Sequence, residues 1–209
     1  MTYIILFILV ILIGLYYSFK HGNNAKKEIQ DLTQKIIIDD TNSMLLWEED
    51  YLMVEIMSSN NIDYANGEID GTPETNKNKQ FKTKDLNISK SEFGNLLRIS
   101  GLKEYEKITY VGAGEPQVLK NSKTKAFGSL SSAILFDGKT DKIEHIWLSS
   151  HNWNEINKTN ILNGLNAIGK QYGMILLDNY PIQNKLVDLK NINEIQDYID
   201  IYVERFNEG

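Results

Sequence analysis

The N-terminal segment of the chain is a long apolar run. Residues Tyr3 to Phe19 read YIILFILVILIGLYYSF and contain no charged side chain. In a helix, with a rise of about 1.5 Å per residue, this run is about 25 Å long, close to the hydrocarbon thickness of a thin bilayer. Its central part is apolar on every side, whereas a helix buried in a soluble domain usually keeps a polar face. Residues 1–22 are therefore predicted to form a transmembrane anchor.

The residues that flank this run favour an uncleaved anchor and indicate its orientation. A signal peptide has a basic segment before the apolar run and a small-x-small cleavage site after it, and neither pattern is found here. Lys20, Lys26 and Lys27 follow the run, and the positive-inside rule places them in the cytoplasm. We expect a single-pass protein of the bacterial inner membrane with a cytoplasmic globular domain. A periplasmic domain is the alternative, because a chain without cysteine suits both compartments.

Beyond the anchor, segments with helical spacing of apolar residues alternate with short strand-like segments. Residues 23–40 carry Ile29, Leu32 and Ile36 at helical spacing and are predicted to be a juxtamembrane helix or linker. Residues 41–209 are enough for one core and are predicted to be a single α+β globular domain. Strands are expected at Asp50–Met57, Lys107–Val111, Met174–Leu177 and Lys185–Leu189, and a hairpin at Ser131–Phe136 and Lys142–Leu148.

The same pattern predicts three helices and one long loop in this domain. The helices are expected from the capping box Ser89–Glu92 to Ser100, over Asn154–Tyr172, and from Ile192 to Phe206. Residues Ser58 to Leu86 are polar and are expected to form a long surface loop. Together these elements predict an antiparallel or mixed sheet with helices packed on one side.

The charged residues are distributed unevenly along the chain. The formal net charge is -6, and the part after Lys27 carries 19 basic and 28 acidic side chains. Ten acids and no lysine or arginine lie between Ile36 and Asn76. A region of one sign can steer a basic partner, although a solvated surface that keeps the domain soluble is the alternative. Because Arg98 and Arg205 are the only arginines, nucleic-acid binding is not expected.

Motifs for cofactor or metal binding are weak. The segment Gly112–Pro116 has two glycines of a dinucleotide-binding loop but lacks the third, so a turn is expected there. His145 and Trp147 are expected on one face of a strand with Ile143, so His145 could line a pocket, while His151 follows in a loop. A zinc site needs three or four ligands, and the chain has no cysteine. No metal and no cofactor are predicted.

Hydrolytic chemistry has little support in the sequence. There is no G-x-S-x-G motif around any serine. Carboxylates at Glu48, Glu49, Asp50 and Glu55 could perform acid-base catalysis if one were held in an apolar pocket. Strand alternation, however, places Asp50 and Glu55 on opposite faces of the predicted strand. We predict no catalytic residue and a protein that is not an enzyme.

Four segments of the domain carry a pattern of strands and turns that can be compared with known families. They are LWEEDYLMVEI (Leu46–Ile56), KAFGSLSSAILFDGKTDKIEHIWL (Lys125–Leu148), GMILLDN (Gly173–Asn179) and KLVDL (Lys185–Leu189). Together they resemble small bacterial immunity proteins of polymorphic or type VI secretion toxin systems. The similarity spans about Leu46 to Tyr198 and consists of strand and turn patterns. The resemblance implies a non-enzymatic inhibitor that binds a cognate toxin and blocks its active site. It implies no particular contact residues, and the anchor is not a general feature of such proteins.

Residues and resemblance together predict a membrane-anchored immunity protein that neutralises a basic cognate toxin. An acidic surface with aromatic residues offers charge for steering and rings for tight contact. The predicted partner-binding residues are Trp47, Glu48, Glu49, Asp50, Tyr51, Glu55, Asp63, Glu68 and Asp70. The alternatives are a structural component of a bacterial envelope complex and a membrane-bound hydrolase built on the carboxylates or on His145.

Overall fold

The computed structural model describes residues 43–70, 79–112, 117–120, 123–129, 132–150, 153–180 and 185–207. The predicted anchor at residues 1–22 and the predicted helix or linker at residues 23–40 lie outside these ranges, as do Gly114, Pro116 and His151. Within these ranges, no helix combines the length and the apolar character needed to cross a bilayer.

A seven-stranded sheet forms the centre of the fold, and all of its neighbouring strands are antiparallel. The strand order is β10-β9-β2-β8-β7-β6-β3. The strands are β2 (Val54–Ser58), β3 (Lys103–Glu104), β6 (Lys125–Ser129), β7 (Ser132–Asp137), β8 (His145–Ser150), β9 (Met174–Asp178) and β10 (Lys185–Asp188). The hairpin of β7 and β8 and the strands β9 and β10 confirm the predicted strands there, within a few residues.

The helices of the described residues are α2 (Ile62–Asp70), α3 (Lys90–Ile99), α4 (Glu155–Tyr172) and α5 (Ile192–Asn207). Local signals set their ends. The Ser89 hydroxyl accepts a hydrogen bond from the amide of Glu92, and the Asn154 side chain accepts one from the amide of Asn157. Gly173 ends α4 with a φ of 63°, a conformation that glycine adopts without strain. The predictions for α3, α4 and α5 are confirmed.

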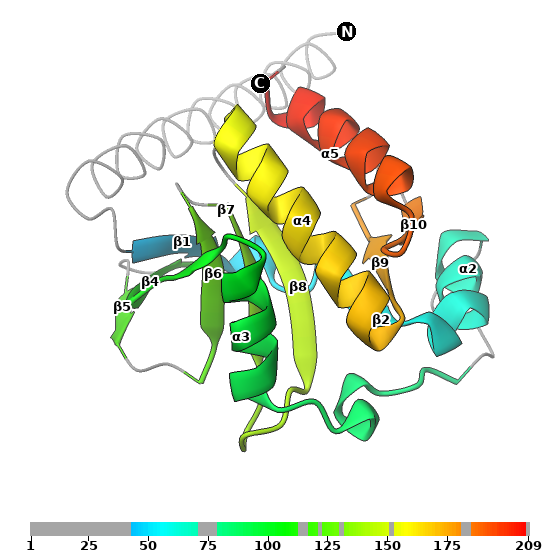
Figure 1. The fold of residues 1–209 in the computed structure, drawn as a ribbon, viewed down its shortest axis with the longest axis horizontal. Helices are drawn as coiled ribbons and strands as arrows, with labels where there is room; N and C mark the ends of the chain where they lie inside the picture. The colour runs from blue at the N-terminus through cyan, green and yellow to red at the C-terminus, as the bar shows by residue number, and fades with distance from the viewer. Residues whose placement is uncertain are drawn as a thin grey trace, which may run out of the picture. The chain divides into compact units, whose positions relative to one another are not determined.

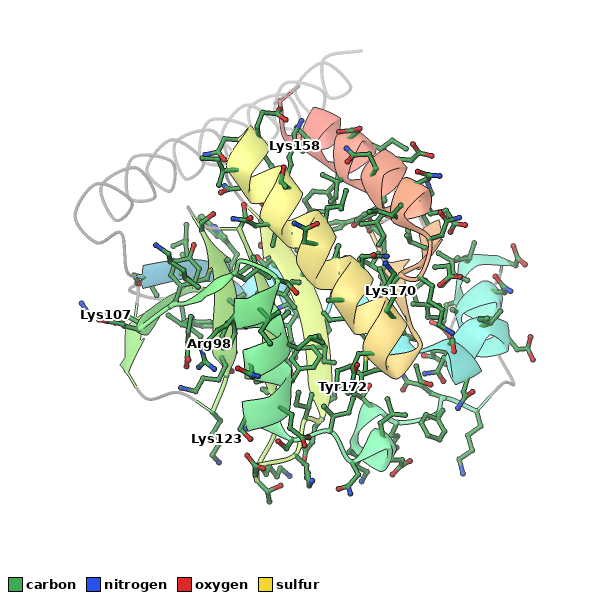
Figure 2. The ribbon with its side chains drawn as sticks, viewed as in Figure 1. Arg98, Lys107, Lys123, Lys158, Lys170 and Tyr172 are labelled. Atoms are coloured by element: carbon green, nitrogen blue, oxygen red, sulfur yellow. The ribbon has the colours of Figure 1, made fainter. Side chains whose placement is uncertain are left out.

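Three helices cover one face of the large sheet. In Figure 1, α3, α4 and α5 lie in front of the strands. Their buried side chains, among them Leu97, Leu165 and Ile199, share one core with the inward residues of β2, β7 and β8. Tyr172 at the end of α4 stacks on Phe93 of α3 with ring centroids 5.8 Å apart (Figure 2). This apolar layer packs the three helices against one face of the sheet.

The opposite face is covered by two separate elements. A three-stranded sheet of β1 (Ser43–Trp47), β4 (Lys107–Val111) and β5 (Gln117–Lys120) packs Met44 and Ile108 against Leu135 and Trp147. The helix α2 packs Ala65 over the β2 and β9 end of the same face. The prediction that helices lie on one side is therefore correct for α3, α4 and α5 and wrong for α2.

The segment Ser58–Leu86 is not the predicted loop. It contains α2 and two short 3-10 helices, η2 (Ser59–Asn61) and η3 (Thr83–Leu86). Ala65 of α2 is fully buried against the sheet. The side chain of Asn61 also exchanges two hydrogen bonds with the backbone of Phe81, which ties the later part of the segment to the earlier part.

The predicted strand Asp50–Met57 begins only at Val54. Glu48 to Asp50 form a short 3-10 helix, η1, and Leu52 has a φ of 59°, which interrupts extended backbone. The predicted shared face of Ile143 with Trp147 is also wrong. Because β8 begins at His145, Ile143 lies outside the strand and packs in the helix-side core instead.

Candidate functional site

The two elements that cover the second face leave two adjoining pockets. Their volumes are about 270 Å³ and about 300 Å³, and both are lined by Lys139, Glu144 and His145. The first is also lined by Glu55, Gln80, Lys82, Thr83 and Lys84, and the second by Tyr51, Lys123, Asp137 and Gly138. We call the two pockets together the groove.

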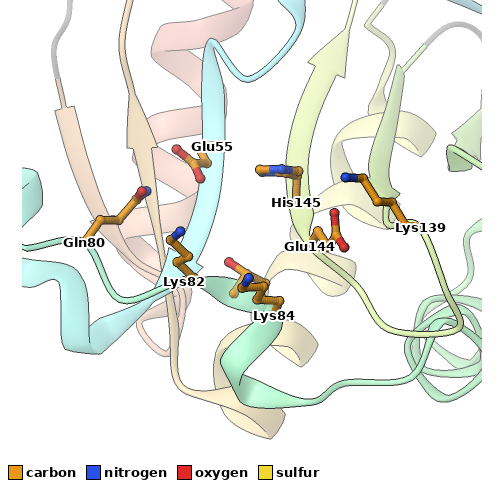
Figure 3. A pocket seen from close by; sticks show the side chains of 8 residues that line it. Glu55, Gln80, Lys82, Lys84, Lys139, Glu144 and His145 are labelled. Atoms are coloured by element: carbon orange, nitrogen blue, oxygen red, sulfur yellow. The ribbon is translucent and has the colours of Figure 1, made fainter.

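Three titratable side chains from adjacent strands form a row in the groove. Asp137 of β7 is directly opposite His145 of β8, and Glu55 of β2 is opposite Trp147 of β8. His145 and Trp147 lie on the same face of β8, so His145 is a diagonal neighbour of Glu55. Figure 3 shows the imidazole of His145 extending from β8 toward the strand that carries Glu55. The row is therefore Asp137, His145 and Glu55.

Glu55 is a partly buried acid without a hydrogen bond or ion pair in the described part of the chain. Burial raises the pKa of its carboxyl group from 4.5 to about 7, because desolvation penalises the charged form. The group therefore changes its charge close to neutral pH.

Asp137 is held between Tyr51 and His145. The hydroxyl of Tyr51 donates a hydrogen bond to Oδ2 of Asp137 at 3.3 Å, while Oδ1 of Asp137 is buried and accepts none. Burial raises the pKa of Asp137, and the nearby His145 and the Tyr51 hydroxyl partly offset this effect. Burial and the carboxylate of Asp137 raise the pKa of Tyr51 to about 12, so this phenol stays protonated.

Tyr51 links the groove to the acidic turn before it. Its side chain is 44% exposed, and its ring meets that of Trp147 edge-on with centroids 5.0 Å apart. Trp147 itself is fully buried. Tyr51 therefore presents an aromatic surface to solvent, and its ring is held in place by the buried ring of Trp147.

The acidic turn η1 is anchored to the fold through Asp50. The hydroxyl of Ser149 donates to Oδ2 of Asp50 at 3.1 Å, and that of Tyr180 donates to Oδ1 at 2.7 Å. Asp50 therefore points toward β8, on the same side of the sheet as Glu55, and the predicted placement of these two acids on opposite faces is wrong. Glu48 and Glu49 are exposed. Burial and the carboxylate of Glu48 raise the pKa of Tyr110, so Glu48 also contacts β4.

The remaining predicted binding residues are spread around the groove. Trp47 ends β1 and is partly buried. Asp63, Glu68 and Asp70 belong to α2, which packs over the β2 and β9 end of this face. Burial, followed by the carboxylates of Glu68 and Glu55, raises the pKa of Tyr64, and none of the three α2 acids lines either pocket.

The acidic segment of the sequence is not a surface of one sign in three dimensions. Lys82 and Lys84, from the end of the lysine-rich stretch, line the groove beside Glu55, and Lys139 lines it from the β7–β8 turn (Figure 3). The sequence reasoning missed these lysines, and it missed Asp137. The lysine run was visible in the sequence, but its position was not, because it depends on the contact between Asn61 and Phe81.

The chemistry open to the groove is proton transfer and charge recognition. Two acids with raised pKa values, Glu55 and Asp137, flank a histidine there, and the carboxyl group of Glu55, with a pKa of about 7, can exchange a proton near neutral pH. Among the described residues, no group of three or more potential ligand side chains is arranged to hold a metal ion. Searches of protein-family models, of curated proteins and of solved structures returned no match to this chain.

Proposed function

We propose that this protein is a membrane-anchored, non-enzymatic immunity protein that binds and neutralises a basic toxin. In this proposal residues 3–19 hold the chain at the membrane, and the acidic turn η1 with Tyr51 forms the centre of the binding surface. The observation that carries the proposal is the anchoring of this turn by Asp50, which is bonded to both Ser149 and Tyr180.

A rigid, charged and partly aromatic turn has the properties of a protein-binding site. Because the hydrogen bonds of Asp50 hold the turn, the backbone that presents Glu48 and Glu49 to solvent has little entropy left to lose on binding. Tyr51 supplies a half-exposed ring of the kind that is enriched at the centres of interfaces. The two glutamates would increase the rate of encounter with a basic partner.

Co-expression with a toxin encoded by the adjacent gene tests this proposal. We expect the wild-type chain to restore growth and to co-purify with that toxin. The triple variant Glu48→Gln, Glu49→Gln, Tyr51→Ala should lose both effects. A control with Glu92→Gln and Asp197→Asn removes two exposed acids from α3 and α5, on the helical side of the sheet, and should keep both. Full rescue by the triple variant would contradict the proposed surface.

A hydrolase is the second candidate, favoured by the row of Asp137, His145 and Glu55. In such an enzyme His145 would act as a general base and Glu55, which with a pKa of about 7 keeps a protonated fraction at neutral pH, as a general acid. Growth rescue distinguishes the candidates, because His145→Ala would abolish protection by an enzyme. Protection by a binder that uses η1 would survive the same change.

A further inference from the structure

The groove contains hydrogen-bond acceptors that nothing in the described structure satisfies. The carboxyl group of Glu55 accepts no hydrogen bond there, and Oδ1 of Asp137 is buried without a donor. A buried acceptor without a donor costs about 1–3 kcal/mol, so proteins rarely leave one unsatisfied without a functional reason. Both acceptors line the two halves of the same groove.

The cationic side chains around the groove do not supply the missing donors. Lys82, Lys84, Lys123 and Lys139 are exposed, and none forms an ion pair with Glu55 or Asp137 within the described part of the chain. Burial alone accounts for the raised pKa of Glu55, which agrees with a carboxyl group that no ammonium group neutralises. A bound molecule with several N–H donors would satisfy both Glu55 and the buried Oδ1 of Asp137.

We propose that the groove receives the guanidinium group of an arginine side chain of the partner protein, with Glu55 as its main acceptor. This inference rests on the proposed function, because it names the group that the basic toxin would insert beside the acidic turn. A guanidinium group carries five donors in a planar fork that matches a carboxylate. Tyr51 and His145 add flat ring surfaces on which such a plane can stack.

A phosphate or carboxylate ligand is the competing occupant. Four lysines line the groove, and an anion would use them. Their exposure argues against this reading, because an ammonium group in solvent binds an anion weakly. Glu55 and Asp137 are less exposed than the lysines, and Oδ1 of Asp137 is buried without a donor among the described residues.

The proposed contact depends on the protonation state of Glu55, because only the ionised carboxylate can accept two N–H hydrogen bonds from a guanidinium group and pair with its charge. Other titratable and charged groups that face this carboxylate also contribute to the net charge of the groove. They are Tyr51 beside η1, Tyr64 and Glu68 from α2, Lys82 and Lys84 from the 79–84 segment, and Asp137, Lys139, Glu144 and His145 from the β7–β8 hairpin. Guanidinium binding should therefore strengthen as the pH rises from 6 to 8 and release a proton.

A titration of the full chain in detergent micelles with N-acetyl-L-arginine methylamide tests this inference without any toxin. Proton NMR of the His145 imidazole reports binding, and His145→Asn identifies its signal among the three histidines. We expect a saturable shift and a Kd about tenfold lower at pH 8 than at pH 6. The variant Glu55→Gln should bind about tenfold more weakly at pH 8 and lose most of the pH dependence.

Matched controls separate the outcomes. N-acetyl-L-citrulline methylamide, which has the same shape without the charge, should cause no saturable shift, and the exposed Glu106→Gln variant should bind as the wild type does. Tighter binding of inorganic phosphate, or full arginine binding by Glu55→Gln, would overturn the inference. In that case growth rescue by the wild-type chain would still support the proposed function, so the two proposals can fail independently.

Discussion

At the scale of the single residue, Glu55 couples the stability of this fold to pH. Its pKa is about 7 in the folded chain and 4.5 for the free side chain. Between these values the unfolded chain loses the proton first, so the folded state becomes less stable as the pH rises. The difference corresponds to about 3 kcal/mol, present in full below pH 4.5 and lost above pH 7.

The variant Glu55→Gln tests this coupling, because glutamine keeps the shape of the side chain and stays neutral. We expect the stability of the variant, relative to wild type, to increase by about 2–3 kcal/mol between pH 5 and pH 8. Urea unfolding of both chains at several pH values measures the difference. Asp137 is unchanged in both chains, so its own titration cancels. A difference that stays constant with pH would show that Glu55 is solvated or paired in the folded chain.

At the scale of the secondary-structure element, η1 is attached to the fold through the side chain of Asp50. Asp50 accepts hydrogen bonds from Ser149 and Tyr180, which belong to β8 and to the segment after β9. Without these bonds the turn would keep its backbone contacts, such as that from the amide of Met53 to the carbonyl of Asp50, and the contact of Glu48 with Tyr110. The attachment therefore controls both stability and the presentation of Glu48 and Glu49.

The variant Asp50→Ala should destabilise the fold by about 2–3 kcal/mol, because hydrogen bonds to a charged group contribute about 1.5–3 kcal/mol. Glu49→Ala, one residue away and exposed, should change the stability by less than about 0.5 kcal/mol. Urea unfolding at pH 7 compares the two variants. Equal stability of both variants would mean that Asp50 is no more important to the turn than its exposed neighbour.

Elements with strong local signals could be predicted from the sequence, and elements stabilised by distant contacts could not. The cap at Ser89 and the Asp137–Asp141 turn are local, so α3 and the β7–β8 hairpin were predicted correctly. The helix α2 contains Asn66 and Gly67, which favour a turn, and it forms because Ala65 is buried on the sheet. The strand β1 depends in the same way on its pairing with β4.

At the scale of the whole molecule, the groove is a product of contacts between distant parts of the sequence. Glu55 and Trp147 are register partners across β2 and β8, and this pairing brings Glu55 close to His145. Sequence reasoning selected Tyr51, Glu55 and His145 one by one from their chemistry. It could not place Asp137 or the lysines beside them, because strand order and the path of residues 79–84 are set by tertiary packing.

The charge of the whole molecule favours a basic partner, while the groove contains both signs. The acids at Glu48 and Glu49 stand at the surface of η1, and the lysines line the groove beside it. Long-range steering is therefore assigned to the exposed acids, and short-range selectivity to Glu55 and its neighbours. In the proposed complex, changes to the exposed acids should therefore alter mainly the association rate, and changes to Glu55 and its neighbours mainly the dissociation rate.

The most direct test of the proposed binding surface is the association rate constant of the full chain with the adjacent-gene toxin, measured at several salt concentrations. Asp50 is left intact because it holds the turn. For Glu48→Gln with Glu49→Gln we predict association about tenfold slower at low salt and a weaker salt dependence than for wild type. The pair Glu92→Gln with Asp197→Asn should match wild type. Identical rates and salt dependence for wild type and the Glu48, Glu49 variant would contradict the proposed acidic binding surface.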